Sequence, residues 1–392
     1  QSPCQEYLPV IESSCWNLLE AAEVKELTPR ERWLAVLNRE KPDRIPMDYW
    51  ATPEATRKLM DYLGCKDEES LFEILHIDRV ITVHPKYVGP PLADGSDGST
   101  IDLVTGTTWT PGAGADIYGN RFRDVEYDGG VYLECVYHAL AQYNSVDEIE
   151  DKYTWPSLDD WDYSVIPEQI KGHEDLPIRG GGSEPFLVYK YLRGDEQAFI
   201  DLIENPEMVH YCLDKLYGLC YENTRRIYEQ IPGKVMITYV AEDLGSQDGL
   251  LYSPDQIREF FIPRMKRMID LAHQAGAFVF HHSDGAIREI LPDMIEAGID
   301  VLNPIQWRCA GMDREGLKRD FGDKIIFHGG VDNQKTLPFG TVEDVRKEVI
   351  DNINILGKEG YILAPCHNIQ VNTPPENVVA MYQTGYQEGW FE

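Results

Sequence analysis

Apolar and polar positions alternate in blocks along the C-terminal half of the chain. Short runs rich in apolar and β-branched residues are separated by longer segments whose apolar residues recur at helical spacing. The predicted strands cover residues 234–240, 277–281, 299–303, 325–328 and 361–364, and the predicted helices cover 253–276, 286–297, 313–320 and 341–357. Strict alternation of this kind predicts parallel strands joined by crossover helices.

The N-terminal half is less regular. Thr28, Pro29 and Glu31 stand in the order of an N-cap, a first helical residue and a capping-box partner, so a helix is predicted over 28–40. Further strands are predicted over 43–50 and 79–83, with two short helices between them. Glycine, threonine and aromatic residues over about 97–135 predict a β-hairpin insertion. Residues 1–27 are expected to be an N-terminal extension, and 28–392 a single domain.

Two architectures satisfy this alternation, an open doubly wound sheet and a closed (β/α)8 barrel. The dinucleotide-binding pattern GxGxxG follows none of the strands, and the glycine run "IRGGGSEPF" (178–186) is predicted to be an ordinary flexible loop. The positions of the polar residues therefore decide between the two.

Each of the five C-terminal strands is followed directly by polar side chains. These are Glu242, Asp243, Gln247, His282, Asp284, Asn303, Gln306, His328, Cys366, His367, Asn368 and Gln370. In barrels of alternating strands and helices, the active site is assembled from loops after the carboxyl ends of several strands. We therefore predict an α/β fold of the (β/α)8 TIM-barrel type.

The stretch "FHHSDG" (280–285) suggests a metal site. Side chains two positions apart on an extended chain share a face, so His282 and Asp284 point together while His281 and Ser283 face the other way. Cys366 would arrive from a later strand as a third ligand. Histidine, aspartate and cysteine all bind zinc, and three protein ligands leave one position open for chemistry.

Simpler interpretations of the same residues remain open. Asp284 could cap the predicted helix 286–297, since aspartate is a preferred N-cap. Cys366 could be an inert buried thiol, and His281 fits a packed, supporting histidine better than a ligand.

Composition restricts the partners. A formal net charge of −31 argues against nucleic acid and against an anionic membrane surface. No apolar run reaches the length of a membrane span, and no signal peptide is visible at the N-terminus. The eight cysteines form no CxxC pair, which favours free thiols in a reducing compartment, with the cytoplasm as the default expectation.

Several motifs together resemble the uroporphyrinogen decarboxylase-like superfamily. They are "LTPRERWLAVLNREKPDRIPMDYW", "EPFLVYKYLRGDEQAFIDLIENPE", "EDLGSQDGLLYSPDQIREFFIPR", "IEAGIDVLNPIQ", "HGGVDNQKTLPFGTVEDVR" and "CHNIQVNTPPENV". The resemblance runs from about residue 27 to the C-terminus and implies a (β/α)8 barrel whose site lies at its C-terminal face.

The superfamily divides by chemistry, and this sequence resembles the corrinoid-dependent methyltransferase and O-demethylase branch. True decarboxylases carry an arginine-bearing "MRQAGR" segment after the first strand, whereas "MDYWATPEATRK" stands here. The thiol-directed methyltransferases carry zinc on a His-x-Cys pair and a distant cysteine. His282 and Cys366 match that pattern, but Asp284 replaces the first cysteine. An oxygen-rich site suits a Lewis acid that polarises an ether better than one that activates a thiol.

The resemblance thus implies a methyltransferase that moves a methyl group between a small, methoxylated substrate and a corrinoid-binding protein, with zinc on His282, Asp284 and Cys366. Glu242 is a candidate fourth ligand or general acid, and His367 or His328 a proton donor. Substrate positioning is expected from Asp243, Gln247, Asn303, Gln306 and Asn368. Alternatives are a coenzyme-thiol methyltransferase, a uroporphyrinogen-type decarboxylase and a non-catalytic corrinoid-docking protein. The oligomeric state, including a homodimer, stays open.

Overall fold

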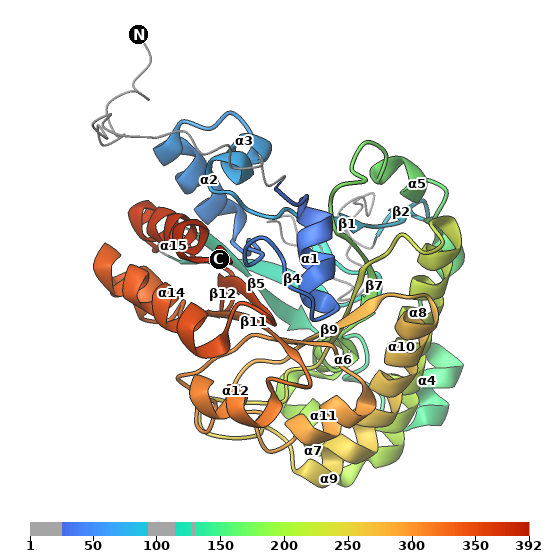
Figure 1. Ribbon diagram of the computed structural model, residues 1–392. Coiled ribbons are helices and arrows are strands. Elements are labelled where there is room, and N and C mark those ends of the chain that lie inside the picture. Colours follow the sequence, from blue (N-terminus) through green and yellow to red (C-terminus); the bar gives the residue numbers. More distant parts are fainter. Residues whose placement is uncertain (1–25, 93–113, 128–129, 392) are drawn as a thin grey trace, which may run out of the picture.

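A curled parallel sheet forms the centre of the protein in the computed structural model, which describes residues 26–92, 114–127 and 130–391 (Figure 1). Its seven strands follow one another in the order β1, β7, β8, β9, β10, β11, β12, and every neighbouring pair is parallel. The strands are β1 Ile81–Val83, β7 Ile178–Ser183, β8 Ile237–Ala241, β9 Phe278–His282, β10 Val301–Asn303, β11 Ile326–Val331 and β12 Tyr361–Pro365. The prediction of an α/β fold with parallel strands is confirmed.

Residues 45–48 lie between the two edges of this sheet. Met47 forms a parallel bridge with Leu363 of β12, and its carbonyl oxygen accepts a hydrogen bond from Asp78, three residues before β1. The strand predicted over 43–50 is thus present as isolated bridges. The result is a half-barrel of the TIM type, in which this short segment stands at the position of an eighth strand.

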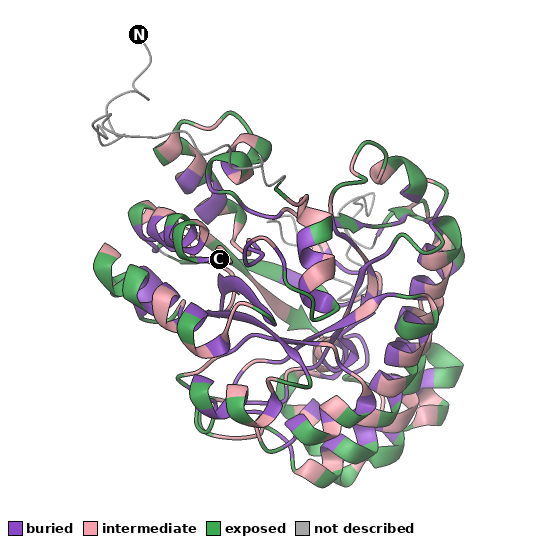
Figure 2. Ribbon diagram, viewed as in Figure 1, coloured by how far each residue is buried: buried purple, intermediate pink, exposed green. Residues whose placement is uncertain are grey.

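Helices surround the sheet, most of them on its outer face (Figure 1). They are α1 Pro29–Leu37, α2 Pro53–Leu63, α3 Glu68–Ile74, α4 Val146–Lys152, α5 Ile166–Gln169, α6 Pro185–Arg193, α7 Asp195–Glu204, α8 Pro206–Gln230, α9 Pro254–Gln256, α10 Ile262–Gln274, α11 Leu291–Ala297, α12 Arg314–Phe321, α13 Thr336–Phe339, α14 Val342–Leu356 and α15 Pro375–Glu388. The buried residues form a large apolar cluster, and Figure 2 shows it as purple strands and inner helix faces beneath exposed outer faces. None of the helices in the described part of the chain is long and apolar enough to cross a membrane.

The helix signals in the sequence act largely as predicted. Thr28 caps α1 in a capping box with Glu31, and Thr341 caps α14 in the same way with Asp344. A π-helical turn, Ile257–Phe261, separates α9 from α10 directly before Pro263. Because proline lacks an N–H group, it cannot continue the regular hydrogen-bond pattern, and the helix predicted over 253–276 is therefore interrupted there.

The predicted helix over 286–297 is only half correct. Helix α11 begins at Leu291, and Pro292 lies in its first turn. Proline is well tolerated there because the first N–H groups of a helix have no partner within it. Residues 286–290 are turns and coil, so the loop after β9 is longer than the sequence analysis assumed.

The prediction of a flexible loop at the glycine run is wrong. Residues 178–183 form β7, and α6 follows directly at Pro185. Gly182 has a φ of +140°, and a Cβ placed there would lie 2.2 Å from the carbonyl oxygen of Tyr239 on β8. A glycine at position 182 is therefore required by the close contact between β7 and β8.

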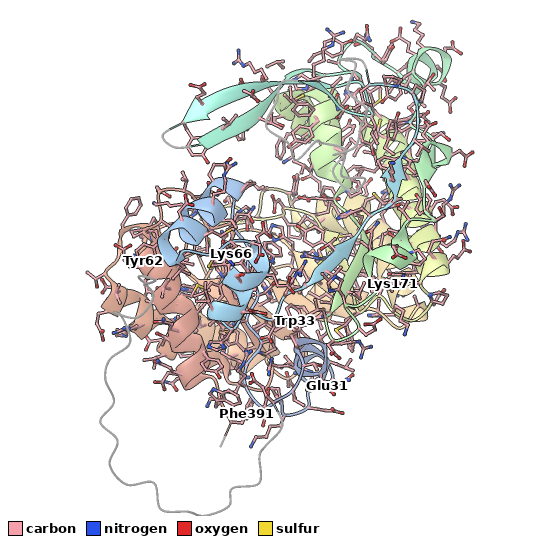
Figure 3. All side chains as sticks on the ribbon, turned by 90° about the horizontal axis from the view of Figure 1, so that it is seen from above. Glu31, Trp33, Tyr62, Lys66, Lys171 and Phe391 are labelled. Atoms are coloured by element: carbon pink, nitrogen blue, oxygen red, sulfur yellow. The ribbon has the colours of Figure 1, made fainter. Side chains whose placement is uncertain are left out.

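Two small antiparallel sheets accompany the central one. Strands β2 (Lys86–Tyr87) and β6 (Trp161–Asp162) pair, and β3 (Gly114–Ala115), β4 (Arg121–Tyr127) and β5 (Gly130–Tyr137) form a three-stranded sheet. The three-stranded sheet lies in and just after the segment 97–135 that was predicted to be a β-hairpin insertion, while 97–113 and most of the 1–27 extension lie outside the described residues. Figure 3 shows β4 and β5 projecting from the body.

Helix α1 closes the inside of the curled sheet at the amino ends of its strands. Trp33, Val36 and Leu37 pack against residues at or near the starts of several strands, among them Ile237 and Val301. Apolar side chains fill this end of the interior, so the polar residues of the interior gather at the carboxyl ends of the strands.

Candidate active site

Three ligand-type side chains meet at the carboxyl ends of β9 and β12. His282 is the last residue of β9, Asp284 lies two residues later, and His367 lies two residues after β12. One potential ligand atom of each lies within 4.8 Å of the other two. Parallel strands deliver their carboxyl ends to the same edge of a sheet, which explains how residues 83 positions apart come together.

A buried chain of hydrogen bonds orients His282. Its Nδ1 lies 2.6 Å from Oδ1 of Asn303, and Nδ2 of Asn303 lies 2.7 Å from Nδ1 of His328. Nε2 of His328 lies 3.0 Å from Oδ2 of Asp48, which also accepts a hydrogen bond from the indole of Trp50. Asn303 and His328 are fully buried, so this chain is shielded from solvent.

The direction of these hydrogen bonds fixes the proton positions. Because the amide oxygen of Asn303 accepts, Nδ1 of His282 carries its proton; because the amide nitrogen donates, Nδ1 of His328 carries a lone pair. His328 then donates from Nε2 to Asp48. Burial acts to raise the pKa of Asp48, but the hydrogen bond from His328 and nearby positive charge outweigh it and hold that pKa below its usual value. The chain leaves a lone pair on Nε2 of His282.

Aromatic rings hold His282 in place from the side. The Trp50 ring stacks on it with 5.9 Å between centroids, and the Tyr239 ring with 5.8 Å. His282 is 5% exposed. A ring held by packing and by one directed hydrogen bond is oriented before any ligand arrives.

Two acceptor atoms face each other across the site. Nε2 of His282 lies 3.9 Å from Oδ1 of Asp284 and 3.8 Å from Oδ1 of Asp243. Oδ1 of Asp284 is buried and has no hydrogen-bond partner among the described residues. Burial raises the pKa of Asp284, although the two histidines oppose that shift. A lone pair and a carboxylate oxygen so placed repel each other unless a proton or a cation lies between them.

The residues present fit a cation. Ligand atoms on a tetrahedral zinc lie roughly 3.3–3.6 Å apart, since each bond measures about 2.0–2.2 Å. The separations around His282 are only slightly longer, and an imidazole with carboxylates is a donor set that zinc accepts. The cap interpretation of Asp284 is wrong, because Ile290 occupies the N-cap of α11 and no side chain bonds there.

His367 carries its proton on the other ring nitrogen from His282. Its Nδ1 accepts a hydrogen bond of 2.8 Å from the backbone N–H of Asn368. In a neutral imidazole the proton then sits on Nε2. Burial lowers the pKa of His367, which favours that neutral form. A cation on Nε2 would require the proton to move to Nδ1, against the Asn368 N–H.

Cys366 does not join the cluster in this structure. β12 ends at Pro365, so the strict alternation of faces cannot be continued to the next residue. The thiol of Cys366 is buried and lies 3.2 Å from the carbonyl oxygen of Ile305, to which it donates. Burial raises the pKa of this thiol well above its usual value. The structure brings His367 to the place that the sequence analysis gave to Cys366.

Glu242 is bonded to other partners outside the cluster. Its carboxylate accepts hydrogen bonds from the Tyr217 hydroxyl on α8 and from the backbone N–H of Phe186 in the first turn of α6. Burial raises the pKa of Glu242 to about 8. These contacts join two outer helices to the end of β8, and Glu242 is not one of the three clustered side chains, so its role as a ligand or acid stays a prediction.

The remaining predicted residues divide between the site and its support. Asp243 lines the cluster and accepts a hydrogen bond from the N–H of Asp284. The side chains of Asn303 and His328 belong to the buried hydrogen-bond chain, in which their polar atoms are already bonded. Gln306 accepts the N–H of Gly285 and so supports the loop. Gln247 is exposed, and Asn368 touches the site through its backbone.

Sequence reasoning missed Asp48, Trp50 and Tyr239. Asp48 lies within the predicted strand 43–50, two residues before its end, so the criterion of polar residues that follow a strand did not select it. In the sequence, Trp50 and Tyr239 are aromatic residues within predicted strands, and this pattern does not distinguish them from ordinary core residues.

A polar, cation-compatible cluster at the carboxyl edge of a curled parallel sheet is the arrangement of a TIM-barrel-like enzyme. The family model for uroporphyrinogen decarboxylase (URO-D) matches residues 165–387. The chain belongs to the uroporphyrinogen decarboxylase family.

Curated relatives are named as members of this family, and a solved structure shares the fold. The chain is 25% identical over 368 residues to a uroporphyrinogen decarboxylase from Anaeromyxobacter dehalogenans, covering 92% of this chain and 99% of the relative. Its similarity to the Microcystis aeruginosa decarboxylase, 24% over 213 residues, covers 54% of each chain, so it spans about half the length of that relative. It also resembles in fold a methyltransferase from Methanosarcina mazei, with a TM-score of 0.62, 18% identity and coverage of 92% and 99%.

Proposed function

We propose that this protein is a methyltransferase that moves a methyl group from a small methoxylated substrate to a corrinoid carried by a partner protein. The observation that carries the proposal is the pair of facing acceptors, Nε2 of His282 and the orphaned Oδ1 of Asp284, held by a hydrogen-bond chain that ends on Asp48. Such a pair is built for a cation. The proposal includes closure of the sheet into a (β/α)8 barrel, with residues 45–48 as its eighth strand.

In this proposal His282 and Asp284 hold zinc, and Asp243 lies within reach as a further oxygen ligand. Zinc bound there supplies a Lewis acid that polarises an ether oxygen. The chain's own contribution is orientation. Asn303 keeps the proton of His282 on Nδ1, His328 and Asp48 keep Asn303 in its amide orientation, and Trp50 limits rotation of the ring.

His367 is the proposed proton donor. When the methyl–oxygen bond of the substrate breaks, the methyl group passes to the reduced corrinoid, which supplies the electron pair of the new bond. The oxygen keeps the electrons of the old bond and needs one proton. The Asn368 N–H holds the proton of His367 on Nε2, so this ring is arranged to give a proton and not to bind a cation.

The composition of the cluster favours an ether over a thiol as the reacting group. The fold likeness to the Methanosarcina mazei protein, whose title names a methyltransferase, supports methyl transfer without specifying the acceptor. In this chain the cluster contains no sulfur. The thiol of Cys366 is hydrogen-bonded to the carbonyl oxygen of Ile305, and an aspartate stands at position 284. A thiolate nucleophile is best held by a sulfur-rich zinc site, so the coenzyme-thiol reaction is the weaker alternative.

The test combines metal content with methyl transfer. The full chain is loaded with zinc, dialysed and analysed for metal, and then mixed with chemically reduced cobalamin and methoxybenzene derivatives while the cobalamin spectrum is followed. We expect one zinc per chain and formation of methylcobalamin. Asp284→Asn should lose both the metal and the transfer, whereas Asp147→Asn, an exposed aspartate on α4, should keep both.

The outcomes separate the alternatives. Demethylation of methylcobalamin only in the presence of thiols would favour the thiol reaction. Zinc binding that is equal in the two aspartate variants would refute the metal site, and loss of transfer without loss of zinc would give Asp284 a different role.

Decarboxylation is the second candidate, because the curated relatives are named uroporphyrinogen decarboxylases. The segment after residue 48 contains no arginine before Arg57, which is 70% exposed and paired with Glu54. A chain with a net charge of −31 that lacks an arginine clamp beside this strand is poorly suited to a substrate with many carboxylates. Incubation with uroporphyrinogen should therefore give no decarboxylated product.

A further inference from the structure

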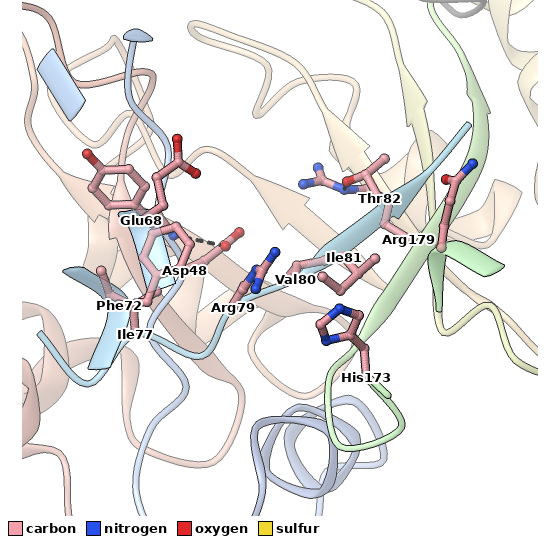
Figure 4. A pocket seen from close by; sticks show the side chains of 12 residues that line it. Asp48, Glu68, Phe72, Ile77, Arg79, Val80, Ile81, Thr82, His173 and Arg179 are labelled. Atoms are coloured by element: carbon pink, nitrogen blue, oxygen red, sulfur yellow. Dashed lines mark hydrogen bonds between the residues drawn. The ribbon is translucent and has the colours of Figure 1, made fainter. Parts of the chain in front are cut away.

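Two cavities of about 440 Å³ each lie in the described part of the protein. The first, shown in Figure 4, borders Asp48 and therefore adjoins the hydrogen-bond chain of the candidate active site. The second is lined by residues from α12, α13, α14 and the loop after β10, and we call it the helix cavity. His282, Asp284 and His367 do not line it, so it is separate from the candidate active site.

The helix cavity is positively charged in a strongly acidic chain. Its lining contains four lysine or arginine side chains and three acidic ones, whereas the whole chain has a net charge of −31. The three carboxylates already have partners. Asp344 belongs to the capping box of α14, and Asp351 is paired with Lys347. Glu348 accepts hydrogen bonds from the Thr336 hydroxyl and from a backbone N–H.

Arg314, the first residue of α12, is buried without a counter-ion. It is 9% exposed, and it forms no ion pair with the residues that the structure describes. Nη1 donates to Oδ1 of Asn352 at 2.6 Å, and the guanidinium lies over the Trp307 ring, 4.3 Å from its centre. Nε and Nη2 have no hydrogen-bond partner among the described residues, yet neither is fully enclosed by protein. This edge of the guanidinium therefore opens to the cavity that Arg314 lines.

The same edge of other arginines in this chain binds a carboxylate. In Arg32, Arg193 and Arg258, Nε and Nη2 together donate to the two oxygens of one aspartate. Two parallel N–H groups match two oxygens of a carboxylate or of a phosphate. A charged side chain as deeply buried as Arg314 is normally paired, because burial without a partner costs free energy. The open edge of Arg314 is thus arranged for an oxyanion from outside the chain.

Lys335 supplies a second positive charge without a partner. Its ammonium group forms no ion pair or hydrogen bond within the parts of the chain that the structure describes. Arg308, by contrast, is paired with Asp332. Two cations of the helix cavity, Arg314 and Lys335, are therefore available to a ligand. Phe339 lines the same cavity and is 76% exposed, so an apolar ring on that ligand would cover it.

We propose that the helix cavity binds a phosphate monoester that carries an apolar ring, with Arg314 and Lys335 on the phosphate and Phe339 on the ring. At pH 7 such a phosphate carries nearly two negative charges, because its second pKa is about 6. It therefore balances both available cations, whereas a carboxylate would leave one of them without a partner. Arginine matches the phosphate with its planar fork, and lysine binds it as a point charge. The proposal goes beyond methyl transfer and does not depend on it.

Binding can be tested without corrinoid, turnover or added zinc. The full chain is titrated calorimetrically with phenyl phosphate, with inorganic phosphate and with benzoate. We expect phenyl phosphate to bind more tightly than benzoate by roughly tenfold or more, with an affinity that falls as salt rises. Inorganic phosphate should bind more weakly than phenyl phosphate, since it lacks the ring.

Three substitutions assign the binding to this cavity. Arg314→Gln should weaken phenyl phosphate by roughly tenfold or more, and Lys335→Gln by roughly threefold because solvent screens its exposed charge. Phe339→Ala should weaken phenyl phosphate and leave inorganic phosphate unchanged. Circular dichroism identifies any variant that fails to fold. Lys335 and Phe339 are exposed, so their variants keep the test open if Arg314→Gln does not fold.

Arg346→Gln is the matched control. Arg346 lies on α14 beside the cavity but does not line it, and its side chain is 51% exposed. The substitution removes the same charge as Lys335→Gln and should leave the affinity for phenyl phosphate unchanged.

Equal affinity for phenyl phosphate and benzoate would overturn the assignment of a phosphate. Wild-type affinity in both Arg314→Gln and Lys335→Gln would overturn the cavity as the site, and so would an equal loss in Lys335→Gln and Arg346→Gln. Equal binding of phenyl phosphate and inorganic phosphate would refute the contact with Phe339.

Discussion

Replacing Asn303 by alanine tests the hydrogen-bond chain that orients His282. Asn303 is fully buried, and its amide makes two hydrogen bonds, of 2.6 Å to His282 and 2.7 Å to His328. The substitution leaves the Nδ1 proton of His282 and the Nδ1 lone pair of His328 without partners. A buried polar group left unpaired costs about 1–3 kcal/mol, so with two such groups the free energy of unfolding should fall by about 2–6 kcal/mol.

A loss of stability alone would not show orientation, so zinc affinity is the decisive quantity. Without Asn303, the His282 ring is free to carry its proton on Nε2, and binding a cation must first reverse that choice. Removal of groups that orient a metal-binding histidine typically weakens metal affinity about 10–100-fold. We expect a loss in that range, measured by competition with a chelating dye.

Asn352→Ala provides the matched control. Asn352 is also fully buried, and its amide accepts from Arg314 at 2.6 Å and donates to the carbonyl oxygen of Gly330 at 2.8 Å. It should lose similar stability in urea unfolding and keep wild-type zinc affinity. Equal zinc affinity in Asn303→Ala and wild type, or an equal loss in both variants, would refute the orienting role.

Three further predictions follow from other contacts. Cys366→Ala should change zinc affinity less than twofold, because the thiol of Cys366 donates a hydrogen bond to the carbonyl oxygen of Ile305 and not to the cluster. A large loss of zinc affinity would show that Cys366 is a ligand. The pKa of Glu242 is raised from 4.5 to about 8 by burial, so the folded protein holds a proton there that the unfolded chain releases. Wild-type stability should therefore fall as the pH rises from about 4.5 to about 8, and Glu242→Gln should show a smaller slope in urea unfolding across that range; identical slopes would contradict this. Gly182→Ala should greatly reduce the yield of folded protein, since its Cβ would overlap the Tyr239 carbonyl, whereas Gly233→Ala, with φ of +67° and open space, should lower the thermal midpoint only modestly. Similar midpoints would show that β7 can shift away.

The sequence was sufficient for the parts of this protein that depend on local chemistry. The capping boxes of α1 and α14 and the interruption before Pro263 involve neighbours within a few residues. The strands of the C-terminal half are apolar runs of the right length between helices, and their alternation implies a parallel sheet. His282 and Asp284 could be paired because they share a strand end.

Other features depended on contacts between distant segments. Whether "IRGGGS" is a loop or a strand depends on the Tyr239 backbone beside it. Glycines carry no side chains, so they give no alternation of apolar and polar residues from which a strand could be predicted. The choice between Cys366 and His367 depends on where β12 ends and on which way the chain turns afterwards.

The sequence alone therefore determined that polar groups stand at the carboxyl ends of parallel strands. The tertiary structure decided which of their atoms face one another. Asp48 reaches His328 across 280 positions, and only then is the lone pair of His282 directed at Asp284. Proton positions follow from complete hydrogen-bond chains, and such a chain exists only when the segments that carry it have been packed together.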